Sequence, residues 1–331
     1  MEHVAVIGAG SWGTAVAALA AHRHPVVLWA RRPALAEMIN ASSENPDYLP
    51  GYRLPFGLRA TSSLEEATKG AIVLVMAVPS HGFSGVMAEI TEVGHDLPVA
   101  SLTKGIEEGT LRRMTQVIAD ALPRHQAERI GVLTGPNLAA EVTAGDPTAA
   151  VVAMTDPEAA AVVQRIFMGP TFRVYTNPDV IGCELAGSLK NVMAIAAGMS
   201  SGLGFGDNTR AALITRALAE LTRLGVALGG QPSTFAGLAG MGDLIATCTS
   251  TKSRNHQVGV GLAKGRKLED IITEMKMVAE GVKTTRAVLE LSEKAGVEMP
   301  IAEQVAEVLY EGRHPRDAVM SLMTREAKAE V

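Results

Sequence analysis

Near the N-terminus, three glycines are spaced as in a loop that holds the phosphates of a dinucleotide. Gly8, Gly10 and Gly13 form a GxGxxG motif between an apolar run over residues 4–7 and an apolar helical pattern over residues 14–21. In such a strand-turn-helix, the first glycine makes the tight turn, the second lets a pyrophosphate approach and the third packs the helix on the strand. The pyrophosphate would then lie on free backbone N–H groups at the start of the helix. A plain glycine-rich turn is the alternative, but the context favours dinucleotide binding.

The end of the second predicted strand bears on which dinucleotide binds. Folds specific for NAD carry an acidic residue about 20 residues after the glycines, but this sequence has Arg31 and Arg32 in that place. Two guanidinium groups can bind a 2′-phosphate or lie over an adenine ring. The sequence therefore favours NADPH without excluding NADH. Alternatively, either arginine is a solvated residue before a helix.

A lysine in an apolar helix is the candidate for proton transfer. Hydride transfer to a carbonyl builds negative charge on its oxygen, and a neighbouring acid must supply a proton. Lys190 lies in the middle of a mostly apolar helical pattern over residues 181–200, and Gly187 and Ala194 share its face. Removal from water lowers the pKa of a lysine towards neutrality, which suits acid–base chemistry. The alternative is a lysine whose ammonium reaches solvent along its stem.

The second half of the chain also contains a candidate phosphate site. Ser253, Arg254 and Asn255 place a hydroxyl, a guanidinium and an amide side by side, a set that suits a phosphate monoester. Asp243 follows a glycine-rich stretch, where its spacing favours a helix N-cap over a role in chemistry. Arg254 as an ordinary surface arginine fits the spacing equally well.

The elements that must position these residues change character in the middle of the chain. Up to about residue 178, apolar runs alternate with helical patterns, which predicts an α/β fold with a mostly parallel sheet. Beyond it, apolar residues recur at the spacing of helices that bury one face. We therefore predict a dinucleotide-binding Rossmann domain over residues 1–178 and an all-helical substrate and catalytic domain over residues 179–331. The predicted strands are residues 4–7, 26–29, 72–78, 99–102, 130–133 and 149–154, and the predicted later helices are 181–200, 208–228, 256–264 and 284 to the end.

Composition narrows the class of protein. The chain has 331 residues, of which 47% are hydrophobic, 20% charged and 4% aromatic, as in a globular protein without an aromatic platform for nucleic-acid bases. Its net charge of −5 requires a local cluster of cations to attract any anionic substrate. Cys183 and Cys248 lack the spacing of metal ligands, so we expect no metal. With no leader or membrane-spanning run recognised, we expect a cytoplasmic protein without a nucleic-acid partner.

Short segments along essentially the whole chain, taken in order, resemble the NAD(P)-dependent glycerol-3-phosphate dehydrogenases of the bacterial type. So many ordered matches are far more specific than GxGxxG alone. The resemblance implies reversible reduction of dihydroxyacetone phosphate to sn-glycerol 3-phosphate by a nicotinamide cofactor, a reaction that feeds phospholipid synthesis. The segments are residues 8–13, 45–51, 103–107, 135–139, 184–198, 202–208, 238–243, 253–255 and 278–281.

The resemblance also implies roles for individual residues. Lys190 matches the proton acceptor of the family, and Lys104 and Arg254 match residues that meet both substrate and cofactor. The implied substrate-binding residues are Lys104, Gly135, Asn137, Lys190, Asp243, Ser253, Arg254 and Asn255. The implied cofactor-binding residues are Gly8, Gly10, Ser11, Trp12, Gly13, Arg31, Arg32, Tyr48, Lys104, Ala139, Arg254, Val278 and Glu280.

One segment departs from the family pattern. The family usually reads Gly-Pro-Ser-Phe-Ala, whereas this chain has Asn137 and Leu138 in place of the serine and the phenylalanine. An amide can still donate to a substrate oxygen. The departure leaves the fold untouched and bears on substrate affinity and cofactor packing.

Two other functions account for part of these features. A related 3-hydroxyacid or ketopantoate-type dehydrogenase would use a carboxylate substrate. A non-catalytic dinucleotide sensor would bind cofactor without turnover, and it would leave the match of Lys190, Asp243 and Arg254 to a catalytic set unexplained. The apolar helices of the second half could supply the face of a homodimer, and the dominant direction of the reaction and any feedback regulation stay open at this point.

Overall fold

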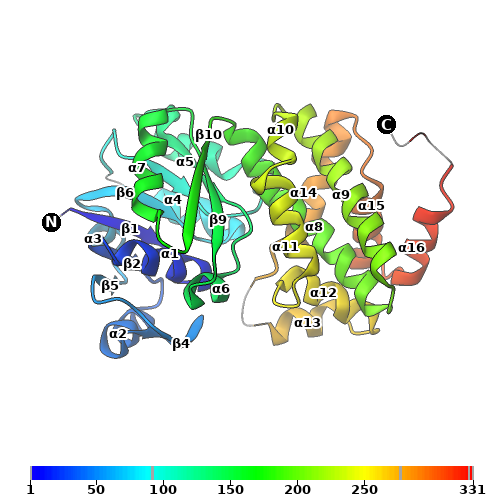
Figure 1. Ribbon diagram of the computed structural model, residues 1–331, viewed down its shortest axis with the longest axis horizontal. Coiled ribbons are helices and arrows are strands. Elements are labelled where there is room, and N and C mark those ends of the chain that lie inside the picture. The colour runs from blue at the N-terminus through cyan, green and yellow to red at the C-terminus, as the bar shows by residue number, and fades with distance from the viewer. Residues whose placement is uncertain (1, 91–92, 276–277, 327–328, 330–331) are drawn as a thin grey trace.

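The computed structural model describes residues 2–90, 93–275, 278–326 and 329, and it shows a sheet half and a helical half side by side (Figure 1). The N-terminus lies at the outer end of the sheet half, and the last helix lies at the outer end of the helical half. The chain passes from one to the other after β10 (Phe172–Asn177), where α8 (Val180–Gly202) begins.

Within the described residues, the main sheet has eight strands in the order β10-β9-β8-β7-β6-β1-β2-β5. Neighbours run parallel except β8 and β9, which are antiparallel, so the predicted mostly parallel sheet is confirmed. The remaining two strands, β3 and β4, form a separate antiparallel pair. The bounds are β1 (His3–Ile7), β2 (Val26–Trp29), β3 (Glu44–Asn45), β4 (Leu49–Arg53), β5 (Leu58–Thr61), β6 (Ala71–Met76), β7 (Val99–Ser101), β8 (Ile130–Thr134) and β9 (Thr148–Ala153).

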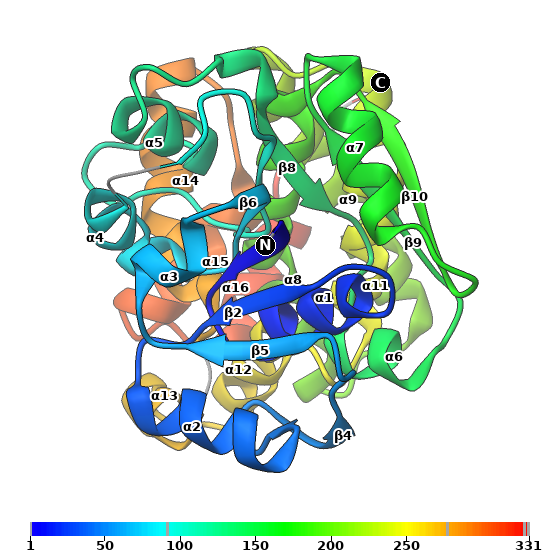
Figure 2. The same ribbon diagram turned by 90° about the vertical axis from the view of Figure 1, so that its left-hand side faces the viewer.

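Helices cover both faces of the sheet, and the strands are apolar on both faces for that reason. In β1, Val4 and Val6 pack with α1 and α7, whereas Ala5 and Ile7 pack with α4 and α5 on the opposite face (Figure 2). The arrow of β1 points towards the helical half (Figure 1), so the carboxyl ends of the parallel strands, where such sheets bind ligands, face that half. The helices are α1 (Ser11–Ala21), α2 (Pro33–Ser42), α3 (Leu64–Thr68), α4 (Ser80–Glu89), α5 (Met114–Ala121), α6 (Ala139–Ala144) and α7 (Pro157–Phe167).

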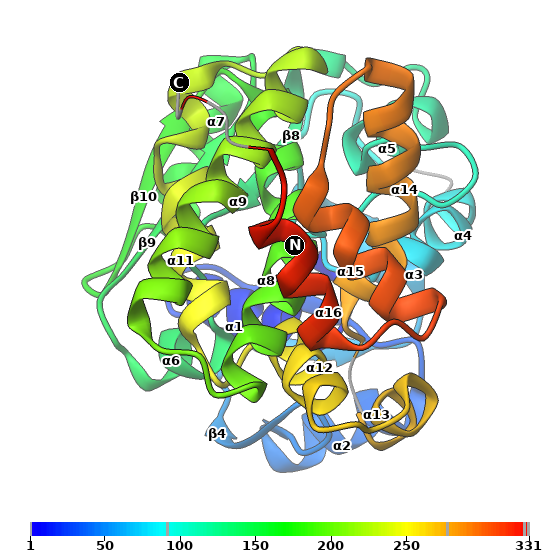
Figure 3. The same ribbon diagram turned by 90° about the vertical axis from the view of Figure 1, so that its right-hand side faces the viewer.

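The central element of the helical half is α8, in which every residue from Gly182 to Ser200 is buried. It is long and apolar enough to cross a membrane, but 89% of its apolar stretch is buried inside the protein, as in a core helix. Glycines let α12 pack closely on it, because a Cβ on Gly198 would lie 2.0 Å from the His256 carbonyl oxygen. Its neighbours include α9 (Asp207–Ala227), α10 (Pro232–Phe235), α11 (Asp243–Thr249) and α12 (Arg254–Ala263). The short helix α13 (Leu268–Glu274) packs on α12 (Figure 3).

Several sequence predictions of elements need correction. The single helical run predicted from residue 284 is three helices, α14 (Glu280–Ala295), α15 (Pro300–Tyr310) and α16 (Pro315–Met323). It breaks because Gly296 and Gly312 adopt left-handed φ angles of 64° and 72°, and a proline begins each following helix. The edge strands β5 and β10 were not predicted, since β10 alternates buried and exposed residues instead of forming a continuous apolar run.

Candidate active site

The turn between β1 and α1 has the geometry of a phosphate loop. Gly8 has a φ of +123°, and a Cβ there would lie 2.6 Å from the Ala77 carbonyl oxygen. A Cβ on Gly13 would lie 2.0 Å from the Gly8 carbonyl oxygen, whereas the space around Gly10 is open to 4 Å. The start of α1 has no side-chain cap and no acidic residue in its first turn. Its N–H groups and the open space at Gly10 fit a pyrophosphate.

The predicted cofactor residues beside this loop lie close together. The Ser11 hydroxyl donates to the Tyr48 carbonyl oxygen at 2.6 Å, which fixes the β3–β4 segment to the start of α1. The Trp12 ring packs near Phe172, with centroids 6.4 Å apart. Within the described structure the Trp12 indole N–H is buried and has no hydrogen-bond acceptor. A bound ligand or a water can supply that acceptor.

Arg31 and Arg32 follow β2 and are both exposed. Arg32 forms an ion pair with Asp47, and its guanidinium lies 6.0 Å from the centroid of the Tyr48 ring. Asp47 is a partner that the sequence prediction missed, because it comes from the β3–β4 connection. Part of the hydrogen-bonding capacity of the Arg32 guanidinium is therefore used by Asp47 and is not free for the 2′-phosphate of a dinucleotide.

At the junction of the two halves, two lysines share one buried carboxylate. The Lys190 ammonium, on α8, donates to Asp243 and also to the Thr247 hydroxyl at 2.6 Å. The Lys104 ammonium, on the loop after β7, donates to the other oxygen of Asp243 at 2.7 Å and to the Gly135 carbonyl oxygen at 2.9 Å. The residue exposures are 5% for Lys190 and 1% for Asp243. This arrangement excludes the solvent-reaching alternative for Lys190.

The prediction of Asp243 as a helix N-cap is wrong. Asp243 is the first residue of α11, and Gly242 takes the cap position. The carboxylate turns towards the two lysines because a buried ammonium must have an opposite charge beside it.

Burial tunes the proton affinity of Lys190. It lowers the pKa of Lys190 to about 7, against the opposing effect of the Asp243 carboxylate, while the charge of Lys104 lowers it further. A lysine with a pKa near neutrality can both give and take a proton at working pH. The arrangement suits a reaction in which an oxygen gains or loses a proton.

The segment after β8 forms one wall of this junction. The Gly135 carbonyl accepts from Lys104, and within the described structure both polar atoms of the Asn137 side chain are buried without a partner. Ala139 begins α6. The amide that replaces the usual serine is thus available for a ligand, since a buried amide without partners is costly.

The Ser253–Asn255 segment lies at the start of α12, and each of its three side chains has a different hydrogen-bond partner. The Ser253 oxygen caps the helix by accepting from the His256 N–H. The Asn255 amide donates to Asn191 and accepts from the Gly281 N–H, both at 2.9 Å. Arg254 is exposed and donates to the Val278 carbonyl oxygen at 2.6 Å. Of the three residues, Ser253 and Asn255 are buried and only Arg254 is exposed.

Glu280 begins α14 and accepts two hydrogen bonds from Ser80 of the sheet half. Burial lowers the pKa of the Arg254 guanidinium, and the charge of Glu280 opposes that shift. Of the three residues of the helical half predicted to meet the cofactor, Arg254 and Val278 are joined by a hydrogen bond, and Glu280 acts on Arg254 through its charge.

The sequence prediction missed Thr247 and Asn191 as parts of the site. Thr247 contacts Lys190, and the Asn191 amide donates to the Lys104 carbonyl oxygen at 2.9 Å. A signal for Thr247 was present, because it lies four residues after Asp243 and so on the same face of α11.

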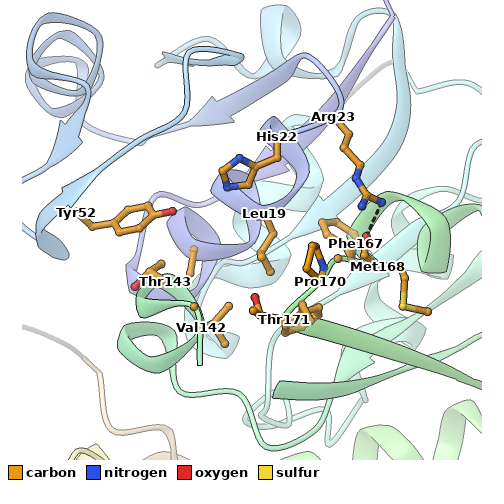
Figure 4. A pocket seen from close by; sticks show the side chains of 14 residues that line it. Leu19, His22, Arg23, Tyr52, Val142, Thr143, Phe167, Met168, Pro170 and Thr171 are labelled. Carbon is orange, nitrogen blue, oxygen red and sulfur yellow. Dashed lines mark hydrogen bonds between the residues drawn. The ribbon is translucent and has the colours of Figure 1, made fainter. Parts of the chain in front are cut away.

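One hollow of the molecule lies outside this site. A hollow of about 460 Å³ between α1, α6, α7 and β10 is lined by residues such as Leu19, His22 and Tyr52 and contains none of the predicted site residues (Figure 4). Within the described ranges, no three His, Cys, Asp or Glu side chains gather as metal ligands.

A Rossmann-like sheet with an open phosphate loop, joined to helices that bury a lysine, is typical of the class of dinucleotide-dependent dehydrogenases. The family models for the N-terminus and C-terminus of NAD-dependent glycerol-3-phosphate dehydrogenase match residues 3–160 and 179–320. The chain belongs to the NAD-dependent glycerol-3-phosphate dehydrogenase family, and the resemblance drawn from its sequence is confirmed.

Individual relatives agree over almost the whole chain. The NAD(P)-dependent glycerol-3-phosphate dehydrogenase of Geobacter sulfurreducens is 53% identical over 331 residues, covering 99% of each chain. One from Sphingopyxis alaskensis is 53% identical over 321 residues, covering 97% of this chain and 96% of its own. The crystal structure of glycerol-3-phosphate dehydrogenase from Coxiella burnetii has a TM-score of 0.92 at 38% identity and covers 98% of this chain and 99% of its own.

More distant structures share only the fold. A ketopantoate reductase family structure from Ralstonia eutropha has a TM-score of 0.57 at 16% identity. The ketopantoate-type alternative is therefore not favoured.

Proposed function

We propose that this protein catalyses the reversible reduction of dihydroxyacetone phosphate to sn-glycerol 3-phosphate. The observation that carries the proposal is the buried cluster of Lys190, Asp243 and Lys104 at the junction of the halves. It combines a lysine with a pKa of about 7 with a second cation. Family membership supports the choice of substrate.

The proposed proton transfer uses the chain's own groups. When bound, a reduced nicotinamide supplies the hydride. Lys190 holds a proton on Nζ and gives it to the C2 oxygen of the ketone as negative charge develops there; in the reverse direction it takes the proton back. Asp243 and Thr247 hold the ammonium in place through the contacts described above.

The phosphate and the hydroxyl groups of the substrate need donors and cations. Lys104, Arg254 and the free amide of Asn137 are the proposed direct partners, because they supply charge or unused donors in a protein of net charge −5. The remaining proposed substrate residues, Gly135, Asp243, Ser253 and Asn255, hold these groups or line the site.

For the cofactor we propose the full set of thirteen residues predicted from the sequence, with the pyrophosphate on the start of α1. The family name supports a nicotinamide dinucleotide, and NADPH over NADH is our proposal. Arg31 is its main support, since Arg32 already pairs with Asp47.

We further propose that residues 1–178 bind the dinucleotide and residues 179–331 the substrate. The predicted setting is the cytoplasm, where the product would feed phospholipid synthesis. The predicted assembly is a homodimer through the helical half, and light scattering on the purified protein measures its mass directly.

The test is the loss of absorbance of the reduced nicotinamide when dihydroxyacetone phosphate is added. We expect loss with NADPH and with NADH, faster with NADPH, and no comparable loss with dihydroxyacetone, which lacks the phosphate. Equal rates with and without the phosphate, or turnover only with a keto acid, would refute the proposed substrate.

A further inference from the structure

The N-terminus of α4 is capped by a carboxylate from the opposite half of the molecule. Glu280 Oε1 accepts from the Ser80 backbone N–H at 3.1 Å, and Oε2 accepts from the Ser80 hydroxyl at 2.5 Å. The helix has no side-chain cap of its own, and its first turn contains no acidic residue. A carboxylate is stabilised at the positive end of a helix. The helix dipole of α4 therefore strengthens this contact between the two halves.

The backbone at Gly105 packs against the same contact. A Cβ placed on Gly105 would lie 2.7 Å from the Ser80 Cβ and 3.0 Å from Glu280 Oε2. Gly105 directly follows Lys104, whose ammonium binds Asp243. The Ser80–Glu280 contact therefore packs against the backbone that carries a lysine of the proposed site.

Both oxygens of Glu280 are held by one residue, and that fixes the orientation of the carboxylate. Burial lowers the pKa of Arg254 and the charge of Glu280 opposes that shift; both residues are predicted to meet the cofactor. Without the Ser80 hydroxyl, one of the two bonds that orient Glu280 is lost, and the carboxylate gains freedom to rotate.

We propose that Ser80 is a positioning residue for the dinucleotide: it orients Glu280 across the junction of the two halves so that Glu280 meets the cofactor in a fixed geometry. The proposal rests on the proposed function, in that Glu280 is taken to contact the dinucleotide. Ser80 itself acts through Glu280.

The test measures dinucleotide binding directly, by quenching of tryptophan fluorescence on titration with NADPH or NADH. The variant S80A removes a hydrogen bond to a charged carboxylate, and we expect it to raise the dinucleotide Kd about tenfold. S80T keeps the hydroxyl and should restore a Kd near that of the unchanged protein. S84A is the matched control, since Ser84 also lies on α4 and its hydroxyl donates to Glu107 within the sheet half; its Kd should not change.

A double-variant cycle separates positioning from a purely structural role. If Ser80 acts through Glu280, adding S80A to E280A should leave the Kd of E280A unchanged. A Kd for S80A within twofold of the unchanged protein, even with a lowered Tm, would overturn the proposal, as would losses that multiply in the double variant. Because the readout is binding, a protein that binds dinucleotide but does not reduce dihydroxyacetone phosphate would refute the proposed function and leave this test valid.

Discussion

The two halves of the molecule prepare for their ligands in different ways. The sheet half offers backbone groups and space: α1 begins without a side-chain cap, and Gly10 has open room beside it. The helical half offers charge, because Lys190 and Asp243 face each other with almost no exposure. Substitutions at the phosphate loop should therefore act through occupied space, and substitutions in the buried Lys190–Asp243 cluster through charge and proton affinity.

The largest effect should come from removing the ammonium on α8. K190M should lower kcat by about a thousandfold or more, because positioned acid–base groups contribute about 10²–10⁴-fold. The dinucleotide Kd should stay within about twofold, since the phosphate loop lies in the other half. Steady-state kinetics and fluorescence titration on one preparation measure both values. K264M changes an exposed lysine at the end of α12 and serves as the control; a K190M variant with near-normal kcat would end the assignment.

A pair of glycine variants tests the role of space in the sheet half. G10A places a methyl group in open room, so Tm should hold while the dinucleotide Kd rises about tenfold or more through a clash with the pyrophosphate. G13A puts a Cβ 2.0 Å from the Gly8 carbonyl oxygen, so it should lower Tm as well. Thermal unfolding with and without dinucleotide distinguishes them. If G10A binds dinucleotide normally, the phosphate does not approach there.

A smaller effect is expected at the predicted 2′-phosphate site. R31A should raise the KM for NADPH about five- to tenfold and that for NADH by less than twofold, because one charge-assisted hydrogen bond is lost. R32A should change the ratio of the KM for NADPH to the KM for NADH less than R31A does, since Arg32 pairs with Asp47. Equal changes for both cofactors in R31A would remove the basis for favouring NADPH.

No effect on activity is expected from a buried carboxylate whose hydrogen-bond partner, Ile301, is outside the proposed site. Glu220, on α9, accepts the Ile301 N–H at the start of α15, and burial raises its pKa from 4.5 to about 7. The folded protein thus holds this proton more tightly than the unfolded chain. Its contribution to stability is full below about pH 4.5 and is lost as the pH rises through about 7.

Denaturant unfolding of E220Q across that range measures the contribution. Because glutamine does not titrate, the free energy of unfolding of the unchanged protein should fall by about 1–3 kcal/mol relative to E220Q between pH 4.5 and 7. Parallel curves for the two proteins would show that Glu220 has an ordinary pKa.

Local features were predictable from the sequence, and contacts between distant segments were not. The phosphate loop at Gly8–Gly13 and the burial of Lys190 could be predicted, because each depends on residues close by in the sequence. The preference of Asp for helix starts is also local, and it misled the prediction for Asp243, whose partner Lys104 lies 139 residues earlier. Ser80 and Glu280 are 200 residues apart, so only the packing of the two halves brings them together.

The central claim is that Lys190 moves the proton, and the pH dependence of ketone reduction tests it most directly. Single-turnover reduction of dihydroxyacetone phosphate requires the protonated lysine, so its rate should fall as the pH rises through about 7. In D243N the inflection should move to lower pH, because the Asp243 charge raises the pKa of Lys190. A rate that is flat between about pH 6 and pH 9, or an inflection that does not move in D243N, would contradict the account.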